Sequence, residues 1–251
     1  MKSYSLLNSR QKRWLKNYCK QYDIRLNIKK LQGVIFILKS GNQWRMLPSR
    51  YGKWKSVYHY FRGISESSWF SRMLKKLLSD RRERLKGKQR RNPHVAIIDS
   101  QSSRCGLPQS QKGIDGNKRI KGIKRHIAVD SHGLPLSATV TTANVHDSKA
   151  AYPLIAQLAA LYESITSIKA DNGYKGRLSE SIKNLLSIDM QCVKSNYGTS
   201  EFIPMEGRWV VERTIAWLDN FRRLCRNYEQ LLTTAASMTK MAFLVILLKH
   251  I

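Results

Sequence analysis

The hydrophobic positions in the first third of the chain recur with the period of an α-helix. This pattern predicts four helices, over residues 10–22, 27–41, 53–63 and 66–84. Asn8 or Ser9 is expected to cap the first helix, and Gly41 is expected to close the second. The first helix is polar and basic and the second is apolar, so we expect the two to pack together. The chain therefore begins with a small all-helical unit.

After residue 93 the period of the pattern changes. Residues 94–99 form a short continuous apolar run without helical spacing, which is typical of a strand buried on both faces. More elements follow, with strands in residues 125–143 (a pair around a Ser-His-Gly turn), 164–171 and 190–195, and helices over 148–163, 178–187, 208–224 and 234–250. Before the last helix the order is βββαβαβα, which predicts an α/β fold: a mixed sheet with helices on its faces. We place the boundary near Pro93, between a helical domain (1–93) and a sheet domain (94–251).

Positive charge is concentrated in the helical part. The chain carries 45 Lys and Arg against 17 Asp and Glu, a net charge of +28. Residues 1–93 hold 25 basic and 4 acidic side chains, whereas residues 94–251 hold 20 and 13. Such a balance calls for a polyanionic partner, and nucleic acid is the obvious one. We interpret the stretch 81–93, nearly all charged and ending in Asn-Pro, as a linker or as an arm on a phosphate backbone.

Several other classes of protein are disfavoured. The four cysteines are far apart and form no zinc-binding cluster with histidine, so we expect reduced thiols in a cytoplasmic protein. The first residues lack the apolar run of a signal peptide, and the most apolar segment (241–248) is too short to span a bilayer. The chain has no GxxxxGK, HExxH or GxSxG motif, which argues against a nucleotide cofactor and against ATPase, protease and esterase activities. His126 and His132 are expected to be strand and turn residues.

Two aspartates are candidates for chemistry because each is expected to end a strand. Asp99 ends the apolar run 94–99, and Asp171 ends the run 164–171 before a glycine-rich turn. Ligands of open α/β sheets bind at this edge, although a strand-end aspartate also commonly starts a turn. If the two strands are neighbours, the carboxylates can converge, and their oxygens suit Mg²⁺ or Mn²⁺ better than zinc.

Two other aspartates have structural interpretations. Asp130 ends a strand as well, but the Ser-His-Gly that follows leads directly into the next strand, so it is expected to be a turn residue. Asp147 is expected to be an N-cap or first-turn acid of the helix that follows it.

Glu212 lies in the predicted helix 208–224, beside its apolar stripe. A glutamate at the rim of a buried face can point into a site. Arg208 and Glu212 are also spaced as an ordinary i,i+4 ion pair, and the pattern of the helix by itself favours that interpretation slightly. Three carboxylates in a basic protein suit phosphodiester chemistry, because two metal ions can stabilise the attacking and the leaving oxygen.

Several segments, in this order and spacing, resemble one known family. They are HVAIIDSQSS, GNKRIKGIKRHIAVDSHGLPL, TTANVHDS, KADNGYKG and RWVVERTIAWLDNFRRL, preceded by GNQWRMLPSRYGKWKSVYHYFRGISESSWF. The chain resembles, over nearly its whole length, bacterial transposases of the insertion sequence five family, within the insertion sequence four superfamily.

The resemblance implies an RNase H-like fold with a DDE triad formed by Asp99, Asp171 and Glu212, which binds two divalent ions, Mg²⁺ with Mn²⁺ as a substitute. It also implies that Arg208 contacts a DNA phosphate. The superfamily has a tyrosine and a lysine where this chain has Met205 and Asp219, so those two roles are not carried over. Only about forty residues separate Asp171 from Glu212, which argues against an inserted domain and a hairpin mechanism that uses one.

Further DNA contacts are expected around the triad and in the helical domain. Lys175 and Arg213 are candidate phosphate ligands, with the cations of the helical domain giving salt-sensitive binding without sequence specificity. The aromatic residues at 44, 54, 58 and 61 are expected to be the core of the helical domain rather than base-stacking groups.

The predicted function is that of a transposase which binds the terminal inverted repeats of its insertion sequence, cleaves the DNA and joins the 3′ ends to a target. It is expected to act in the bacterial cytoplasm, at the nucleoid, on double-stranded DNA and as a homodimer or higher oligomer. Two alternatives stay open: a structure-specific nuclease on the same core, and an inactive DNA-binding relic of a transposase.

Overall fold

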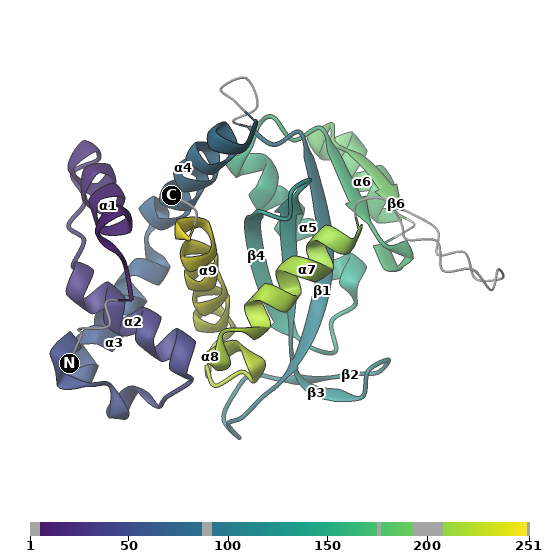
Figure 1. Ribbon diagram of the computed structural model, residues 1–251. Coiled ribbons are helices and arrows are strands. Elements are labelled where there is room, and N and C mark those ends of the chain that lie inside the picture. The colour runs from purple at the N-terminus through teal and green to yellow at the C-terminus, as the bar shows by residue number, and fades with distance from the viewer. Residues whose placement is uncertain (1–5, 87–91, 175–176, 193–207, 250–251) are drawn as a thin grey trace.

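The computed structural model describes residues 6–86, 92–174, 177–192 and 208–249 (Figure 1). A group of helices lies on one side of the molecule, a twisted sheet lies on the other, and α9 runs between them. None of the described helices is long and apolar enough to cross a membrane.

The first two helices begin and end as their sequence predicts. Helix α1 (Ser9–Gln21) begins with a capping box, in which the Asn8 side chain accepts from the Gln11 amide and the Gln11 side chain accepts from the Asn8 amide. Helix α2 (Ile28–Ser40) ends at Gly41, whose φ of 73° is in the left-handed region. Asn8 and Gly41 are thus confirmed as boundary residues.

Two short helical turns and two longer helices complete the first group. They are η1 (Trp44–Met46), η2 (Ser49–Tyr51), α3 (Trp54–Glu66) and α4 (Ser68–Lys86). The Trp44 ring lies 5.1 Å from the ring of Tyr58 and 5.6 Å from that of Phe61. Phe61 is fully buried, and Trp44, Trp54 and Tyr58 pack against the core. These aromatic side chains are therefore core residues, as predicted.

The charged stretch 81–93 differs from the prediction. Helix α4 continues through its first part to Lys86, and residues 87–91 lie outside the described residues. Arg82 is 6% exposed and forms an ion pair with Asp130, which is fully buried. The interpretation as a DNA-binding arm is therefore wrong for Arg82, because its charge is used inside the protein.

The sheet has a central strand with an antiparallel neighbour on one side and a parallel neighbour on the other. Strand β1 pairs antiparallel with β3 and parallel with β5, which pairs parallel with β6, while β4 pairs antiparallel with β3. The strands are β1 (Val95–Arg104), β2 (Gly113–Asp115), β3 (Ile120–Asp130), β4 (Pro135–Thr142), β5 (Ser167–Ala170) and β6 (Asp189–Cys192). This arrangement is the predicted RNase H-like mixed sheet.

Two details of the strands differ from the prediction. The short β2, which pairs with the start of β3, has no counterpart among the predicted strands. Strand β1 does not end at Asp99 but continues to Arg104, opposite Gly122 of β3. The polar residues after Asp99 belong to the strand because β3 keeps pairing with it after β5 has ended.

Helices cover both faces of the sheet. Figure 1 shows α7 crossing in front of β1 and α5 behind the sheet. Helix α6 packs on α5 and β6, and the short η4 turn lies against α5. Their bounds are α5 (Asp147–Leu161), η4 (Asn172–Tyr174), α6 (Arg177–Leu186), α7 (Arg208–Asp219), α8 (Arg222–Cys225) and α9 (Leu232–Leu248).

Helix α9 joins the two parts of the molecule. Its residues from Met241 to Leu248 are all buried, which is typical of a helix with packing partners on every side. It contacts α2, α3 and α4 as well as β4. The helical part and the sheet therefore share one continuous hydrophobic core. The boundary near Pro93 stays a prediction.

Candidate active site

Asp99 and Asp171 occupy equivalent positions on neighbouring strands. Strand β1 pairs in parallel with β5 in a register that sets Ile97 opposite Lys169. Continued by two residues along both segments, this register sets Asp99 opposite Asp171, which immediately follows the last residue of β5. Residues at opposite positions share a face of the sheet, and adjacent strands lie about 4.8 Å apart. The two carboxylates are therefore neighbours.

Local hydrogen bonds orient both carboxylates. The amide of Ser100 donates to Asp99 Oδ1 at 2.7 Å. The amide of Gly173 donates to Asp171 Oδ1 at 3.0 Å, which closes a turn directly after β5. A Cβ atom on Gly173 would come within 3.1 Å of that same oxygen. A glycine at 173 thus gives the Asp171 side chain the room that this turn needs.

A buried tyrosine lies beside these acids. Tyr174 is 2% exposed, and its side chain shares a hydrogen bond with Ser100. Burial raises the pKa of the Tyr174 hydroxyl far above its usual value, and the charges of Asp147, Asp99 and Asp171 raise it further. The phenol is therefore neutral and keeps its proton beside the carboxylates. Sequence reasoning missed Tyr174; the signal was an aromatic residue three positions after a strand-end aspartate.

A second group of polar side chains lies on the opposite face of the sheet from Asp99, the face that carries α5. Asp147 Oδ1 lies 3.2 Å from Lys124 Nζ, and the same nitrogen lies 3.7 Å from Asp115 Oδ2. Asp147 is in the first turn of α5, which confirms the structural role predicted for it. Its pairing with Lys124 adds a second role, because it holds α5 to the middle of β3.

His126 belongs to the same group of side chains. It is 1% exposed, its Nε2 is 2.9 Å from Thr141 Oγ1, and its Nδ1 is 3.9 Å from Asp147 Oδ1. Burial lowers the pKa of His126 to about 4, against the opposing effect of Asp147. The ring is neutral at pH 7 and lies within β3, so the prediction of a strand residue is confirmed.

Glu212 is on a helix that covers the face of the sheet on which Asp99 lies. Gln101, two residues beyond Asp99 on β1 and on the same face, donates to Asp219 Oδ1 of α7 at 3.0 Å. Asp219 and Glu212 are seven residues apart and so share a side of α7. Thr214, nearer the middle of α7, donates to the Gly133 carbonyl at 2.6 Å and so holds the helix to the turn between β3 and β4. The exposed Glu212 therefore belongs to the side of the sheet that carries Asp99.

The described residues have the ligand chemistry for a divalent ion but not a closed set of ligands. Asp99 and Asp171 offer adjacent hard oxygen ligands, which suit Mg²⁺ or Mn²⁺. Within the described parts of the chain, no three His, Cys, Asp or Glu side chains are grouped closely enough to hold a metal ion. The pair of aspartates therefore fits such an ion, and the third carboxylate is not yet beside them.

The three predicted phosphate ligands have different positions. Lys175 lies outside the described residues, and so does the side chain of Arg208, the first residue of α7. The Arg213 guanidinium lies 4.5 Å from the Trp209 ring and 4.9 Å from the Trp217 ring, and it donates to the His132 carbonyl at 2.7 Å. Arg213 thus holds α7 to the turn between β3 and β4, and its phosphate contact stays a prediction.

A buried cation that the sequence analysis did not single out connects the end of α8 to β1. Arg125 is 1% exposed, and it donates to the Leu224 carbonyl at 2.8 Å and to Gln101 Oε1 at 3.2 Å. Burial lowers the pKa of Arg125 to about 10, while Asp219 acts in the opposite direction. The guanidinium stays charged at neutral pH and orients Gln101 two residues from Asp99.

Comparison with protein families gives two matches. A family described as "Transposase DDE domain" matches residues 90–248. A second, described as "Putative transposase of IS4/5 family", matches residues 23–74. The two matches fall on the sheet part and on the helical part of the chain, respectively.

Comparison with individual proteins gives more distant similarities. The "Putative transposase for insertion sequence element IS402" of Burkholderia cepacia is 33% identical over 142 residues, which span 53% of this chain and 65% of that protein. The catalytic core domain of BIV integrase aligns with a TM-score of 0.36 and 13% identity, over 59% of this chain and 82% of its own. The Mos1 transposase paired-end complex aligns with a TM-score of 0.30 and 10% identity, over 85% and 83%. Because the family described as "Transposase DDE domain" matches more than half of it, the chain belongs to the DDE-domain transposases.

Proposed function

We propose that this transposase binds the terminal inverted repeats of its insertion sequence, cleaves the DNA there and joins the 3′ ends to a target in a cut-and-paste reaction. The observation that carries the proposal is the register of β1 and β5, which makes Asp99 and Asp171 neighbours on one face of the sheet. Helix α7, with Glu212, covers β1 on the same face. The common face of the three acids supports the proposal of a DDE triad, in which Glu212 has still to approach the two aspartates.

In the proposal Asp99 and Asp171 hold divalent ions, Mg²⁺ or Mn²⁺, and Glu212 is the third ligand. Two such ions, when bound, would stabilise charge on the attacking and the leaving oxygen of a phosphodiester. The chain's own part is to place the carboxylates. Backbone amides orient Asp99 and Asp171. Gln101 holds α7 to β1, and Thr214 holds it to the turn between β3 and β4.

The neutral Tyr174 side chain lies next to the two aspartates without adding charge to the site. The charges of Asp99 and Asp171 raise the pKa of its hydroxyl, which is uncharged at neutral pH. A buried anion at this point would repel divalent-ion ligands that are already negative, whereas a phenol can share a hydrogen bond with Ser100 and leave the net charge of the site unchanged.

The proposed substrate is double-stranded DNA, bound by a homodimer or a higher oligomer. A net charge of +28 suits a polyanion, and 25 of the 45 cations lie in residues 1–93. Arg208, Lys175 and Arg213 are the proposed phosphate ligands next to the triad.

The test is to replace each carboxylate by its amide, in Asp99→Asn, Asp171→Asn and Glu212→Gln. Each variant is assayed with Mg²⁺ for cleavage of a labelled duplex that carries the inverted repeat, for joining of the 3′ ends to a plasmid, and for binding of the duplex. We expect cleavage and joining to fall by more than the roughly 10–100-fold that changing a group behind a metal ligand costs, with binding retained.

The matched control is Glu163→Gln, an exposed carboxylate beyond the C-terminal end of α5, which lies before the start of β5 whereas Asp171 follows its end. It should keep wild-type activity. Cleavage without any joined product from the wild-type protein would identify a nuclease, and unchanged rates in all three amide variants would overturn the assignment of the triad. A wild-type protein that binds the duplex and gives neither product would be a relic.

A further inference from the structure

Five cations surround a hollow at the far end of β1. They are Arg104, Lys112, Arg119, Lys121 and Arg226, and we call them together the basic hollow, which has a volume of about 510 Å³. In Figure 1 this end of the sheet carries β2 and the start of β3, with α8 beside it. None of these five residues belongs to the proposed triad or to its phosphate ligands.

Hydrogen bonds between three backbone segments hold the basic hollow in place. Three segments that are distant in sequence run side by side there, because Cys105 pairs with Asn227 in a parallel bridge and its amide donates to the Lys121 carbonyl at 3.4 Å. The Gly106 amide donates to the Asn227 carbonyl at 2.7 Å, and the Asn227 amide donates to the Arg104 carbonyl at 2.8 Å. The positions of the cations are therefore set by hydrogen-bonded backbone.

The positive charge of the basic hollow is not balanced within the described residues. No carboxylate lines it, and none of its five cations forms an ion pair with a side chain that the structure describes. Lys112 donates to the Pro108 carbonyl at 2.6 Å, whereas Arg104, Arg119, Lys121 and Arg226 are exposed. Cations this close repel one another unless an anion lies between them.

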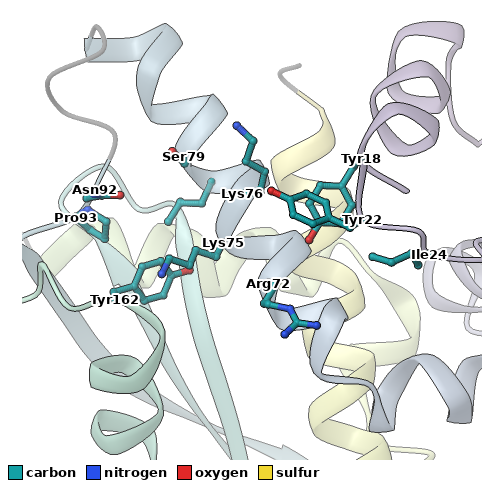
Figure 2. A pocket seen from close by; sticks show the side chains of 11 residues that line it. Tyr18, Tyr22, Ile24, Arg72, Lys75, Lys76, Ser79, Asn92, Pro93 and Tyr162 are labelled. Atoms are coloured by element: carbon teal, nitrogen blue, oxygen red, sulfur yellow. The ribbon is translucent and has the colours of Figure 1, made fainter. Parts of the chain in front are cut away.

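The lining indicates a phosphate backbone rather than a base. Among the described residues that line the basic hollow, none has an aromatic ring on which a base could stack. The pocket in Figure 2 has the opposite character: Tyr18, Tyr22 and Tyr162 line it, and one of its cations, Lys76, is already paired with Asp80 at 2.7 Å. Exposed guanidinium and ammonium groups without a stacking surface are the usual contacts to DNA phosphates.

The distance from the triad fits a single duplex. Arg104 is five residues beyond Asp99 on the same strand, which corresponds to roughly 16 Å at about 3.3 Å per residue. Successive phosphates of one DNA strand advance by about 3.4 Å along the helix axis, so this span is close to five base pairs.

We propose that the basic hollow is a second DNA-binding site, which holds backbone phosphates of the duplex about five base pairs from the phosphodiester at the triad. The inference rests on the proposed function for the duplex at the triad. Phosphates of the element's own end and of the target have the same chemistry, and either can be the source.

The test compares the double variant Arg104→Gln with Arg226→Gln against the wild-type protein. The control is Lys183→Gln with Lys249→Gln, which removes the same charge from two exposed positions, one on α6 and one after α9. Binding of two labelled duplexes, one with the inverted repeat and one of unrelated sequence, is measured over a series of salt concentrations. Thermal unfolding checks that each variant is folded.

We expect the slope of log K against log salt to become shallower by about 1.8 in the hollow variant and to stay as in wild type in the control, because each phosphate contact contributes about 0.9. Near 0.15 M salt this corresponds to roughly 30-fold weaker binding. A change with the repeat duplex alone identifies the element end as the source, a change with the unrelated duplex alone identifies the target, and a change with both identifies any duplex.

Two results would overturn the inference: a folded hollow variant with wild-type affinity for both duplexes, or an equal loss in the control. Neither depends on the triad, because binding is measured without cleavage. Failure of the triad would instead be seen as active amide variants with this binding result unaffected.

Discussion

Replacing Arg82 by methionine removes the cation of an ion pair that joins α4 to the hairpin of β3 and β4. Both partners are buried, Arg82 with 6% exposure and Asp130 with none. The change leaves the Asp130 carboxylate buried without its cation, and breaking a buried pair in this way costs about 3–5 kcal/mol. For a chain of this size that corresponds to a fall in Tm on the order of 10 °C.

A double-mutant cycle separates the pair from its surroundings. In Asp130→Asn the side-chain oxygen can still accept from the amides of His132 and Leu134, each of which donates to Asp130 Oδ1 at 2.8 Å. Combining this change with Arg82→Met removes both charges at once, so the double variant should be less destabilised than the sum of the single ones. We expect a coupling energy within about 0.5–3 kcal/mol.

The assay is urea unfolding followed by circular dichroism, with Arg84→Met as the control at an exposed position two residues away. The control should stay within about 0.5 kcal/mol of wild type. If Arg82→Met is equally harmless but makes the salt dependence of DNA binding shallower, the side chain lies on DNA rather than on Asp130, and the burial argument is refuted.

Two further predictions concern stability alone. The pKa of His126 is lowered to about 4 from about 6.5 in the unfolded chain, so the neutral ring's contribution to the free energy of unfolding is intact above pH 6.5 and is lost as the pH falls towards 4, by about 3 kcal/mol in all. In urea unfolding at a series of pH values, His126→Gln should therefore lose less stability than wild type between pH 6.5 and 4. An equal loss in the two proteins would contradict this prediction. Gly122→Ala should destabilise the protein by about 1–3 kcal/mol or more, because a Cβ atom there would lie 1.9 Å from the Ser103 carbonyl oxygen. The control is Gly116→Ala, whose added Cβ would meet no atom within 4 Å and should change Tm little. Equal Tm values for the two variants would refute the predicted clash.

Local signals in the sequence were enough for most of the elements. The side chains that cap α1 and the glycine that ends α2 act within a few residues, so the pattern around Asn8 and Gly41 defines both boundaries. The second half of β1 could not be predicted in this way. Its serines are polar, and they are part of a strand only because β3, some twenty residues later, pairs with them.

In the candidate site, too, some features follow from local sequence and others depend on distant segments of the chain. Asp99 and Asp171 could be selected from the apolar runs that precede them, although the register that makes them neighbours is a property of the sheet. The pair formed by Arg82 and Asp130 had no such signal, since the two residues lie far apart in the chain. Tyr174 had only its position three residues after Asp171, because its partner Ser100 lies elsewhere in the chain. Charge composition indicated that cations are abundant, but it could not distinguish a cation used in the core from one facing outward.

The central position of α9 has a consequence for the order of events during synthesis. The helices α2 and α4 are complete once Lys86 has been made, but the helix against which they pack begins only at Leu232. At about 5–20 residues per second, the ribosome needs roughly 7–30 s to make the chain between them. Throughout that time the apolar sides of α2 and α4 lack their partner, so the nascent chain should be a client of chaperones until its last helix has emerged.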